Sequence, residues 1–191
     1  MGKTCLQKKI FLICSSLIVM VTPVEERIFP FEVTSNVTEL SQQDPVALYL
    51  KDNRWACAGD GCLSDRAIDR FARNLRAMGS EHNIPVAMLV GVVMVENPWL
   101  DSLVTSPAGA IGLLQVMPMH KEAWKQCGQP MESISGSTCR GSAILADFLS
   151  RRGSEWSALL GYNGCKGGPC ESYPIKVSQH SSRFISIQSD D

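Results

Sequence analysis

Apolar residues recur at helical spacing after Ser64 and Asp65, a pair suited to capping a helix. They stand three or four positions apart and leave arginines on the opposite side. The apolar positions are Ala67, Ile68, Phe71, Ala72 and Leu75, and the arginines are Arg66, Arg70, Arg73 and Arg76. This pattern predicts an amphipathic helix whose arginines face solvent.

A nearly continuous apolar segment follows at residues 86–95, directly after Pro85. Proline suits the first turn of a helix, and a helix that is apolar on all sides is typical of a protein core. The residue before a proline resists the α conformation, so Pro98 ends this helix at about Glu96 or Asn97. One carboxylate is therefore expected at the end of a buried helix.

The remaining segments have weaker patterns. Residues 140–150 and 155–162 show helical spacing, whereas residues 108–113 predict a tight turn with a short strand or loop. We interpret residues 23–63 as an extended or loosely packed N-terminal extension and residues 176–191 as a polar tail that ends loosely. The expected fold is mainly α, with one small loop or β subdomain.

The first 22 residues have the composition of a leader. Lys8 and Lys9 precede an apolar run of 12 residues, 10–21, which as a helix spans about 18 Å against about 30 Å of hydrocarbon core. This indicates a signal peptide at residues 1–22 and export to the periplasm or cell envelope. A short inner-membrane anchor through residues 8–22 and a buried N-terminal helix or strand stay open as alternatives.

Charge and composition exclude two classes of protein. The chain is 45% hydrophobic, which is too apolar for a disordered chain. Its formal net charge is −1, and beyond residue 22 there are 15 basic and 19 acidic residues. Because no basic face is evident, nucleic acid is not an expected partner.

Eight cysteines divide between the leader and the rest of the chain. Six of them follow the leader, and an even count in an exported chain favours disulfides. We favour the local pairs Cys57–Cys62, Cys127–Cys139 and Cys165–Cys170. The alternative is a zinc site formed by the first and last of these pairs. The three histidines are scattered, and we expect no metal or cofactor.

Glu96 is the residue with the clearest chemical potential. Apolar neighbours would desolvate its carboxylate and raise its pKa; they are Val92, Val93, Val95 and Trp99. A carboxylic acid that is partly protonated near neutral pH is what general acid catalysis at a glycosidic oxygen requires. A glutamate that only caps the helix or forms a salt bridge fits the residue pattern equally well.

Three landmarks in order resemble the soluble lytic transglycosylases. They are Glu96-Asn97-Pro98-Trp99, the segment 106–118 that contains Gly112-Leu113-Leu114-Gln115, and Tyr162-Asn163-Gly164. Gly141 stands where the family has a glycine between the last two. The resemblance covers about residues 65–175 and implies a lysozyme-like domain at 64–175, in which the helices and the small subdomain flank a glycan cleft.

The resemblance also implies roles for single residues. Glu96 is similar to the family's single catalytic acid and base. The implied substrate-binding residues are Ser106, Gly112, Gln115, Met117, Tyr162 and Asn163. The chain departs from the family at Asn97, where serine is usual, and at Ser106, which lies one position further from the glutamate than is common.

The implied reaction is cleavage of the β-1,4 bond between N-acetylmuramic acid and N-acetylglucosamine in peptidoglycan, with formation of 1,6-anhydro-N-acetylmuramic acid. Two alternatives stay open. A hydrolytic muramidase on this fold would use a second carboxylate such as Asp101, although a turn or capping role is favoured for that residue. An inactive glycan-binding module would have the same glycan cleft without catalytic activity. The biological setting is left between wall turnover, a secretion or conjugation apparatus, and a phage.

Overall fold

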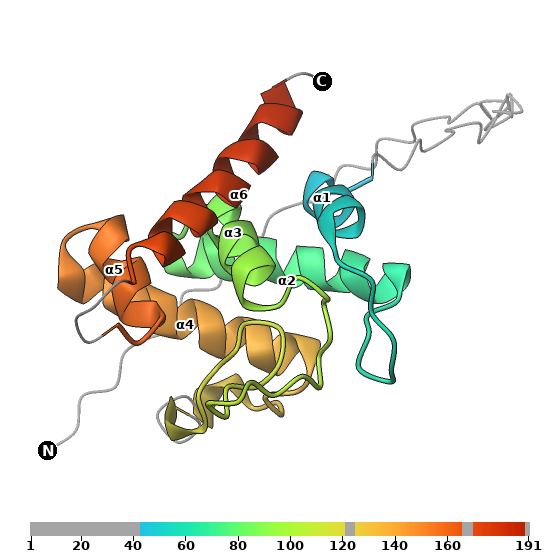
Figure 1. Ribbon diagram of the computed structural model, residues 1–191, viewed down its shortest axis with the longest axis horizontal. Coiled ribbons are helices and arrows are strands. Elements are labelled where there is room, and N and C mark those ends of the chain that lie inside the picture. The colour runs from blue at the N-terminus through green and yellow to red at the C-terminus, as the bar shows by residue number, and fades with distance from the viewer. Residues whose placement is uncertain (1–42, 121–124, 166–169, 190–191) are drawn as a thin grey trace, which may run out of the picture. The chain divides into compact units, whose positions relative to one another are not determined.

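The computed structural model describes residues 43–120, 125–165 and 170–189. They belong to one compact unit that begins at Leu40. The expected signal peptide and about half of the expected N-terminal extension, residues 23–42, lie outside the described residues. The described part contains six α-helices and two short 3₁₀ helices (Figure 1): α1 Pro45–Asn53, α2 Asp65–His82, α3 Val86–Glu96, η1 Pro118–His120, η2 Lys125–Cys127, α4 Ile134–Arg152, α5 Glu155–Tyr162 and α6 Ser172–Ser189.

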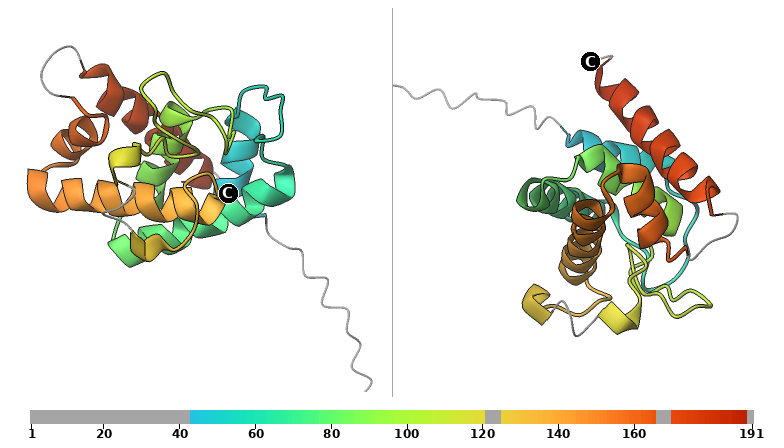
Figure 2. Two further views of the ribbon diagram at one scale, coloured as in Figure 1. Left: turned by 90° about the horizontal axis from the view of Figure 1, so that it is seen from below. Right: turned by 90° about the vertical axis from the view of Figure 1, so that its left-hand side faces the viewer.

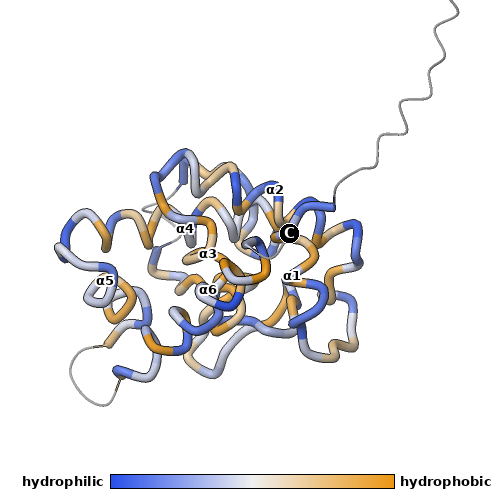
Figure 3. Tube along the Cα trace, turned by 90° about the horizontal axis from the view of Figure 1, so that it is seen from above, coloured by the Kyte–Doolittle hydropathy of each residue, from blue (hydrophilic) through white to orange (hydrophobic). Residues whose placement is uncertain are grey.

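Helix α3 forms the centre of the unit. Every residue from Ala87 to Met94 is buried, as its uninterrupted apolar sequence predicted, and Figure 3 colours much of this helix as hydrophobic. Helices α1, α2 and α6 all pack against it. Gly91 lets α6 approach closely, because a Cβ atom there would lie 2.5 Å from the Val177 carbonyl oxygen. The core thus surrounds the helix that ends at Glu96.

The remaining helices extend this core. Helix α4 packs against α2 and α5 (Figure 2). Gly141 on α4 faces the Leu114 side chain with no room for a Cβ atom. The start of α2 after Ser64, the end of α3 at Glu96 and both ends of α5 match the predictions, but α4 begins well before residue 140. It starts after Ser133, whose side-chain oxygen accepts a hydrogen bond from the Gly136 N–H at 3.0 Å.

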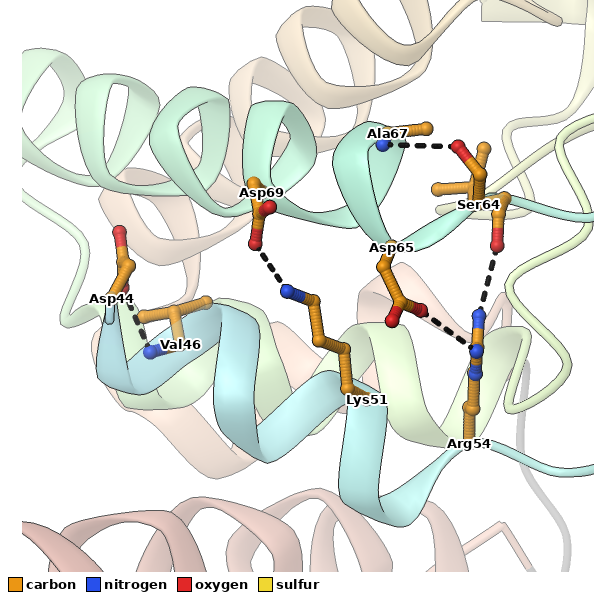
Figure 4. A network of polar contacts seen from close by, with 9 residues as sticks. Asp44, Val46, Lys51, Arg54, Ser64, Asp65, Ala67 and Asp69 are labelled. Carbon is orange, nitrogen blue, oxygen red and sulfur yellow. Dashed lines mark hydrogen bonds and ion pairs between the residues drawn. The ribbon is translucent and has the colours of Figure 1, made fainter. Parts of the chain in front are cut away.

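The expectation of a loosely packed segment before residue 63 is wrong for its described part. Helix α1 begins at Pro45, is capped by the Asp44 side chain, and buries Val46, Ala47, Tyr49 and Leu50. Ion pairs join it to α2 in Figure 4, from Lys51 to Asp69 at 2.6 Å and from Arg54 to Asp65 at 3.0 Å. The apolar stripe of α1 is only about two turns long, so its periodicity is weak in the sequence.

The expected loose tail is wrong as well, because helix α6 occupies it through Ser189. Tyr173, Val177 and Phe184 are buried along one face of α6. Phe184 packs edge to face on Tyr49 of α1, with ring centroids 5.4 Å apart. The sparse apolar residues of this segment stabilise the helix through tertiary packing, and sequence periodicity detects that poorly.

The small subdomain that the sequence predicted consists of loops held by isolated β-bridges. These join Cys62 to Asp101, Thr105 to Ile111 and Ile111 to Val116, and no longer strand occurs in the described segments. In Figure 1 the loops that follow α3 lie on one side of the helices. The mainly α fold is therefore confirmed.

The structure pairs the six cysteines in the local manner that the sequence favoured: Cys57–Cys62, Cys127–Cys139 and Cys165–Cys170. The alternative zinc site is wrong, because its four sulfur atoms are taken up in two of these disulfides. Across the described ranges, no helix has the length and apolar character needed to cross a membrane.

Candidate active site

Glu96 is the last residue of α3, and its carboxylate meets a side chain from the far end of the chain. The Tyr173 hydroxyl on α6 donates a hydrogen bond of 2.6 Å to Glu96 Oε1. Burial raises the pKa of Glu96 from 4.5 to about 7, and the hydrogen bond from Tyr173 opposes part of that rise. No neighbouring negative charge contributes to this pKa shift. Glu96 is therefore partly protonated near neutral pH because it is desolvated.

Two tyrosines surround this carboxylate. The pKa of Tyr162 and that of Tyr173 are both raised well above the usual value, first by burial and then by the negative charge of Glu96. Both phenols consequently stay protonated and act as hydrogen-bond donors. They differ in their acceptors, because the Tyr162 hydroxyl donates to the Leu114 carbonyl oxygen at 2.8 Å. One tyrosine thus orients the acid, and the other fixes the loop beside it.

Asn97 closes the turn that follows Glu96. It is fully buried, and its Nδ2 donates to the carbonyl oxygens of Asp101 at 2.7 Å and Gly112 at 3.2 Å. Its Oδ1 accepts from the Asp101 N–H at 3.2 Å. The residue that departs from the usual family pattern therefore joins the end of α3 to the loop of residues 104–116. Serine is too short to form this set of three bonds.

Gly112 and Gln115 form the inner part of that loop. Gly112 has φ +76°, and a Cβ atom there would lie 2.9 Å from the Met131 carbonyl oxygen, so only glycine fits. Gln115 Nε2 donates to the Gly112 carbonyl oxygen at 2.8 Å, which supplies the partner expected for this amide. Gln115 itself has φ +48°, an uncommon conformation for a residue with a side chain.

The other residues singled out in the sequence have local contacts in this structure. Ser106 Oγ accepts from the Ala110 N–H at 3.0 Å, within the turn before Gly112. Met117 is half-buried, and Asn163 is exposed at the C-terminal end of α5. Trp99, expected to help desolvate Glu96, is 39% exposed and packs edge to face on Trp55 at 5.1 Å.

Asp101 has the turn role that the sequence favoured. Its Oδ1 accepts a hydrogen bond of 2.8 Å from the Leu103 N–H. Among the described residues, burial and the Tyr173 hydroxyl account for the altered pKa of Glu96, and no acidic side chain contributes to it. A half-protonated carboxyl group of this kind can donate a proton and later accept one.

Sequence reasoning missed Tyr173, the direct partner of Glu96. It lies three residues before the segment 176–191, which was interpreted as a loose tail, and it belongs to the same helix. Two signals were available. The spacing of Tyr173 and Val177 places both on one helical face, and the Tyr173 hydroxyl is a polar group on that otherwise apolar face.

A helical domain in which one desolvated carboxylate ends a buried helix is the architecture of a lysozyme-like glycan-cleaving domain. The sequence profile of the Transglycosylase SLT domain matches residues 73–170, just over half of the chain, and the chain belongs to this family. It is also similar to a protein named "Transglycosylase" from Enterobacteria phage PRD1, with 32% identity over 111 residues. That match covers 54% of this chain and 40% of the phage protein, so the chain spans about two fifths of its relative.

Proposed function

We propose that this protein is a lytic transglycosylase that cleaves the β-1,4 bond between N-acetylmuramic acid and N-acetylglucosamine in peptidoglycan. The observation that supports this most directly is the state of Glu96, which is desolvated, has a pKa of about 7 and is held by Tyr173. Glu96 would be the only general acid and base. Family membership independently supports the reaction class.

The proposed reaction uses the Glu96 carboxyl group twice, first as an acid and then as a base. The protonated carboxyl group donates its proton to the glycosidic oxygen, and the bond from that oxygen to C1 of the muramic sugar breaks. The substrate's own N-acetyl oxygen stabilises the positive charge at C1. The Glu96 carboxylate then removes the proton of the C6 hydroxyl group, and the C6 oxygen bonds to C1. This closes the 1,6-anhydro ring, restores Glu96 and consumes no water.

The surrounding residues support this use of one carboxylate. Because Tyr173 donates to Oε1, the second oxygen of Glu96 is the one proposed to face the sugar. Gly112 and Gln115, held by Asn97, would form the adjacent wall of the glycan cleft. We retain Ser106, Met117, Tyr162 and Asn163 as proposed substrate contacts; this list comes from the resemblance to the family.

The proposed setting is the cell envelope, reached by export through the leader, with the catalytic domain at residues 64–175. Helices α1 and α6 pack on that domain and belong to its folded unit. The relative from a phage favours a phage setting, in which the enzyme would open the wall locally; a secretion or conjugation apparatus is the alternative setting. Peptidoglycan strands are the proposed substrate in each case.

The deciding experiment is mass spectrometry of the products released from purified peptidoglycan by the disulfide-bonded chain, beside a Glu96→Gln variant. We expect muropeptides lighter by one water than their reducing counterparts, and only with the intact glutamate. Reducing-end products would instead establish a hydrolase and require a second carboxylate. Binding without release by either protein would establish a glycan-binding module.

A further inference from the structure

A pocket lies between the loops and the start of α4, and Glu96 is not among its lining residues. It has a volume of about 510 Å³ and is lined by Ile111, Pro118, Gln129, Met131, Glu132 and Arg140, among others. One of its walls is shared with the active-site loop, since Ile111 precedes Gly112. Two other lining residues, Gly128 and Arg140, each adjoin a cysteine of the Cys127–Cys139 disulfide, which ties η2 to α4.

Arg140 is the unusual residue of this pocket. Arg140 is only 6% exposed. Its Nε and Nη1 atoms are buried and have no hydrogen-bond partner in the described structure. Glu132 also lines the pocket but is exposed, and it forms no ion pair with Arg140. A guanidinium group keeps its proton in proteins, so burial cannot neutralise it. The fold therefore holds an uncompensated positive charge beside a pocket.

A second source of positive potential coincides with this guanidinium group. Arg140 Nη1 lies 2.8 Å from the position that a Cβ atom on Gly136 would take, so it reaches back to the first turn of α4. The positive end of the dipole of this 19-residue helix lies at that turn, where the Gly136 N–H is bonded to Ser133 Oγ. The space left by the missing Gly136 side chain is taken up by the Pro130 carbonyl oxygen, with the guanidinium group beside it. The helix end and the arginine together favour an anion.

We propose that the Arg140 pocket binds a free carboxylate of the peptide stem that peptidoglycan carries on its muramic sugar. This inference rests on the proposed function, because the stem leaves the sugar whose bond Glu96 would break. The pocket is connected to that site through Ile111 and Gly112, and Gly112 accepts a hydrogen bond from Asn97 next to the catalytic residue. A carboxylate is a preferred charge-assisted partner of an arginine guanidinium group. Glu132 at the rim would disfavour a more highly charged anion.

The test measures binding by isothermal titration to the full, disulfide-bonded chain in a Glu96→Gln background, which prevents turnover. The probes are N-acetylmuramyl-L-alanyl-γ-D-glutamyl-diaminopimelate, the same compound with its carboxyl groups amidated, and inorganic phosphate. We expect amidation to weaken binding about 10-fold or more, as for a lost charge-assisted hydrogen bond. Arg140→Met should weaken the free-acid probe by a similar factor, and amidation should then have no further effect.

The matched control is Arg73→Met, which removes an exposed arginine of α2 and should leave all affinities unchanged. Arg140→Lys keeps the charge but loses the paired N–H groups, and it serves as the second variant if Arg140→Met does not fold. Equal binding of both muropeptides to the unsubstituted pocket would overturn the proposal. So would phosphate that binds more tightly than the free-acid probe.

Failure of the two proposals can be told apart. If anhydro products form but amidation has no effect, the pocket proposal fails and the reaction stands. If no product forms while amidation and Arg140→Met still weaken binding, the pocket stands and the reaction proposal fails.

Discussion

Glu96 and Arg140 are two ionisable side chains that the same fold removes from water, and the consequences differ. Glu96 has a neutral partner, the Tyr173 hydroxyl, and its pKa rises to about 7. Arg140 has no partner for Nε and Nη1, and it cannot lose its proton. Burial therefore produces an acid at the end of α3 and an unpaired cation at the start of α4.

The comparison shows that desolvation by itself does not define a function. A carboxyl group relieves the cost of burial by binding a proton, which is a reagent for general acid catalysis. A guanidinium group relieves it only by binding an anion from outside. The first solution suits a reaction that moves one proton back and forth, and the second suits recognition of a charged substrate.

The largest expected effect separates the two sites by kinetics. Glu96→Gln should lower kcat about 10²- to 10⁴-fold on glycan strands with or without peptide stems. A positioned general acid contributes a factor of this size. Arg140→Met should raise KM about 10-fold on strands with stems and leave stem-free strands unaffected. The measurement is chromatography of released products over a range of substrate concentrations. Glu81→Gln, at an exposed position of α2, is the control.

If Arg140→Met raised KM equally on strands with and without peptide stems, the Arg140 pocket would have no separate role in recognising the stem. A Glu96→Gln variant with undiminished kcat would exclude the carboxylate as the acid.

The second effect concerns stability and its dependence on pH. The folded-state pKa of Glu96 is raised from 4.5 to about 7, so between these values the folded chain binds more protons than the unfolded chain. Stability contributed by this group is thus lost as pH rises from about 4.5 to 7. Glu96→Gln should remove that loss. Its free energy of unfolding should exceed that of the unsubstituted chain by up to about 3 kcal/mol at pH 8 and by almost nothing at pH 4.

Arg140→Met should change stability in a different way from Glu96→Gln. It removes an unpaired buried charge that does not titrate, so its gain in stability should be the same at pH 4 and pH 8. Thermal unfolding of both variants at the two pH values checks this. A gain that varies with pH for Arg140→Met, or one that is constant for Glu96→Gln, would contradict the assigned charge states.

The sequence predicted the parts of the fold whose patterns are long and locally capped. Helices α2, α3 and α5 have periodic or continuous apolar positions and clear boundaries, such as Ser64 before α2. Helices α1 and α6 were missed because their apolar stripes are short or sparse. Phe184, for example, is buried only because α1 supplies Tyr49 as its partner. Such contacts are tertiary and leave no local signal.

The same distinction applies to the candidate site. Glu96 could be found because it ends a long apolar segment that is visible in the sequence. Tyr173 could not, since its position depends on how closely α6 packs on α3 at Gly91. Arg140 has an ordinary place at the start of a predicted helix, and its burial arises from loops that fold over α4 far from it in sequence.

The third effect tests whether the Arg140 pocket depends on its disulfide. Replacing Cys127 and Cys139 by alanine opens a loop of 12 residues, and we expect a loss of about 2–3 kcal/mol in the free energy of unfolding. Binding of the free-acid muropeptide should weaken while the pH profile of kcat stays unchanged. The matched control replaces Cys57 and Cys62. Equal weakening by both pairs would show that the disulfide acts on overall stability alone.

The smallest expected effect compares the two tyrosines near Glu96. Tyr173→Phe removes the hydrogen bond that lowers the Glu96 pKa, so the pKa should rise and the alkaline limb of kcat/KM should move to higher pH. The loss of orientation should reduce kcat by about 10-fold or less.

Tyr162→Phe removes the bond to the Leu114 carbonyl oxygen and leaves the bond between Tyr173 and Glu96 in place. It should therefore lower activity through the position of the loop, with the alkaline limb unmoved. The pH dependence of kcat/KM for the two variants decides the matter. If both limbs move equally, the tyrosines act together through burial of Glu96. If only the Tyr173→Phe limb moves, a single hydrogen bond from α6 sets the pH at which the acid is available, and α6 belongs to the catalytic machinery.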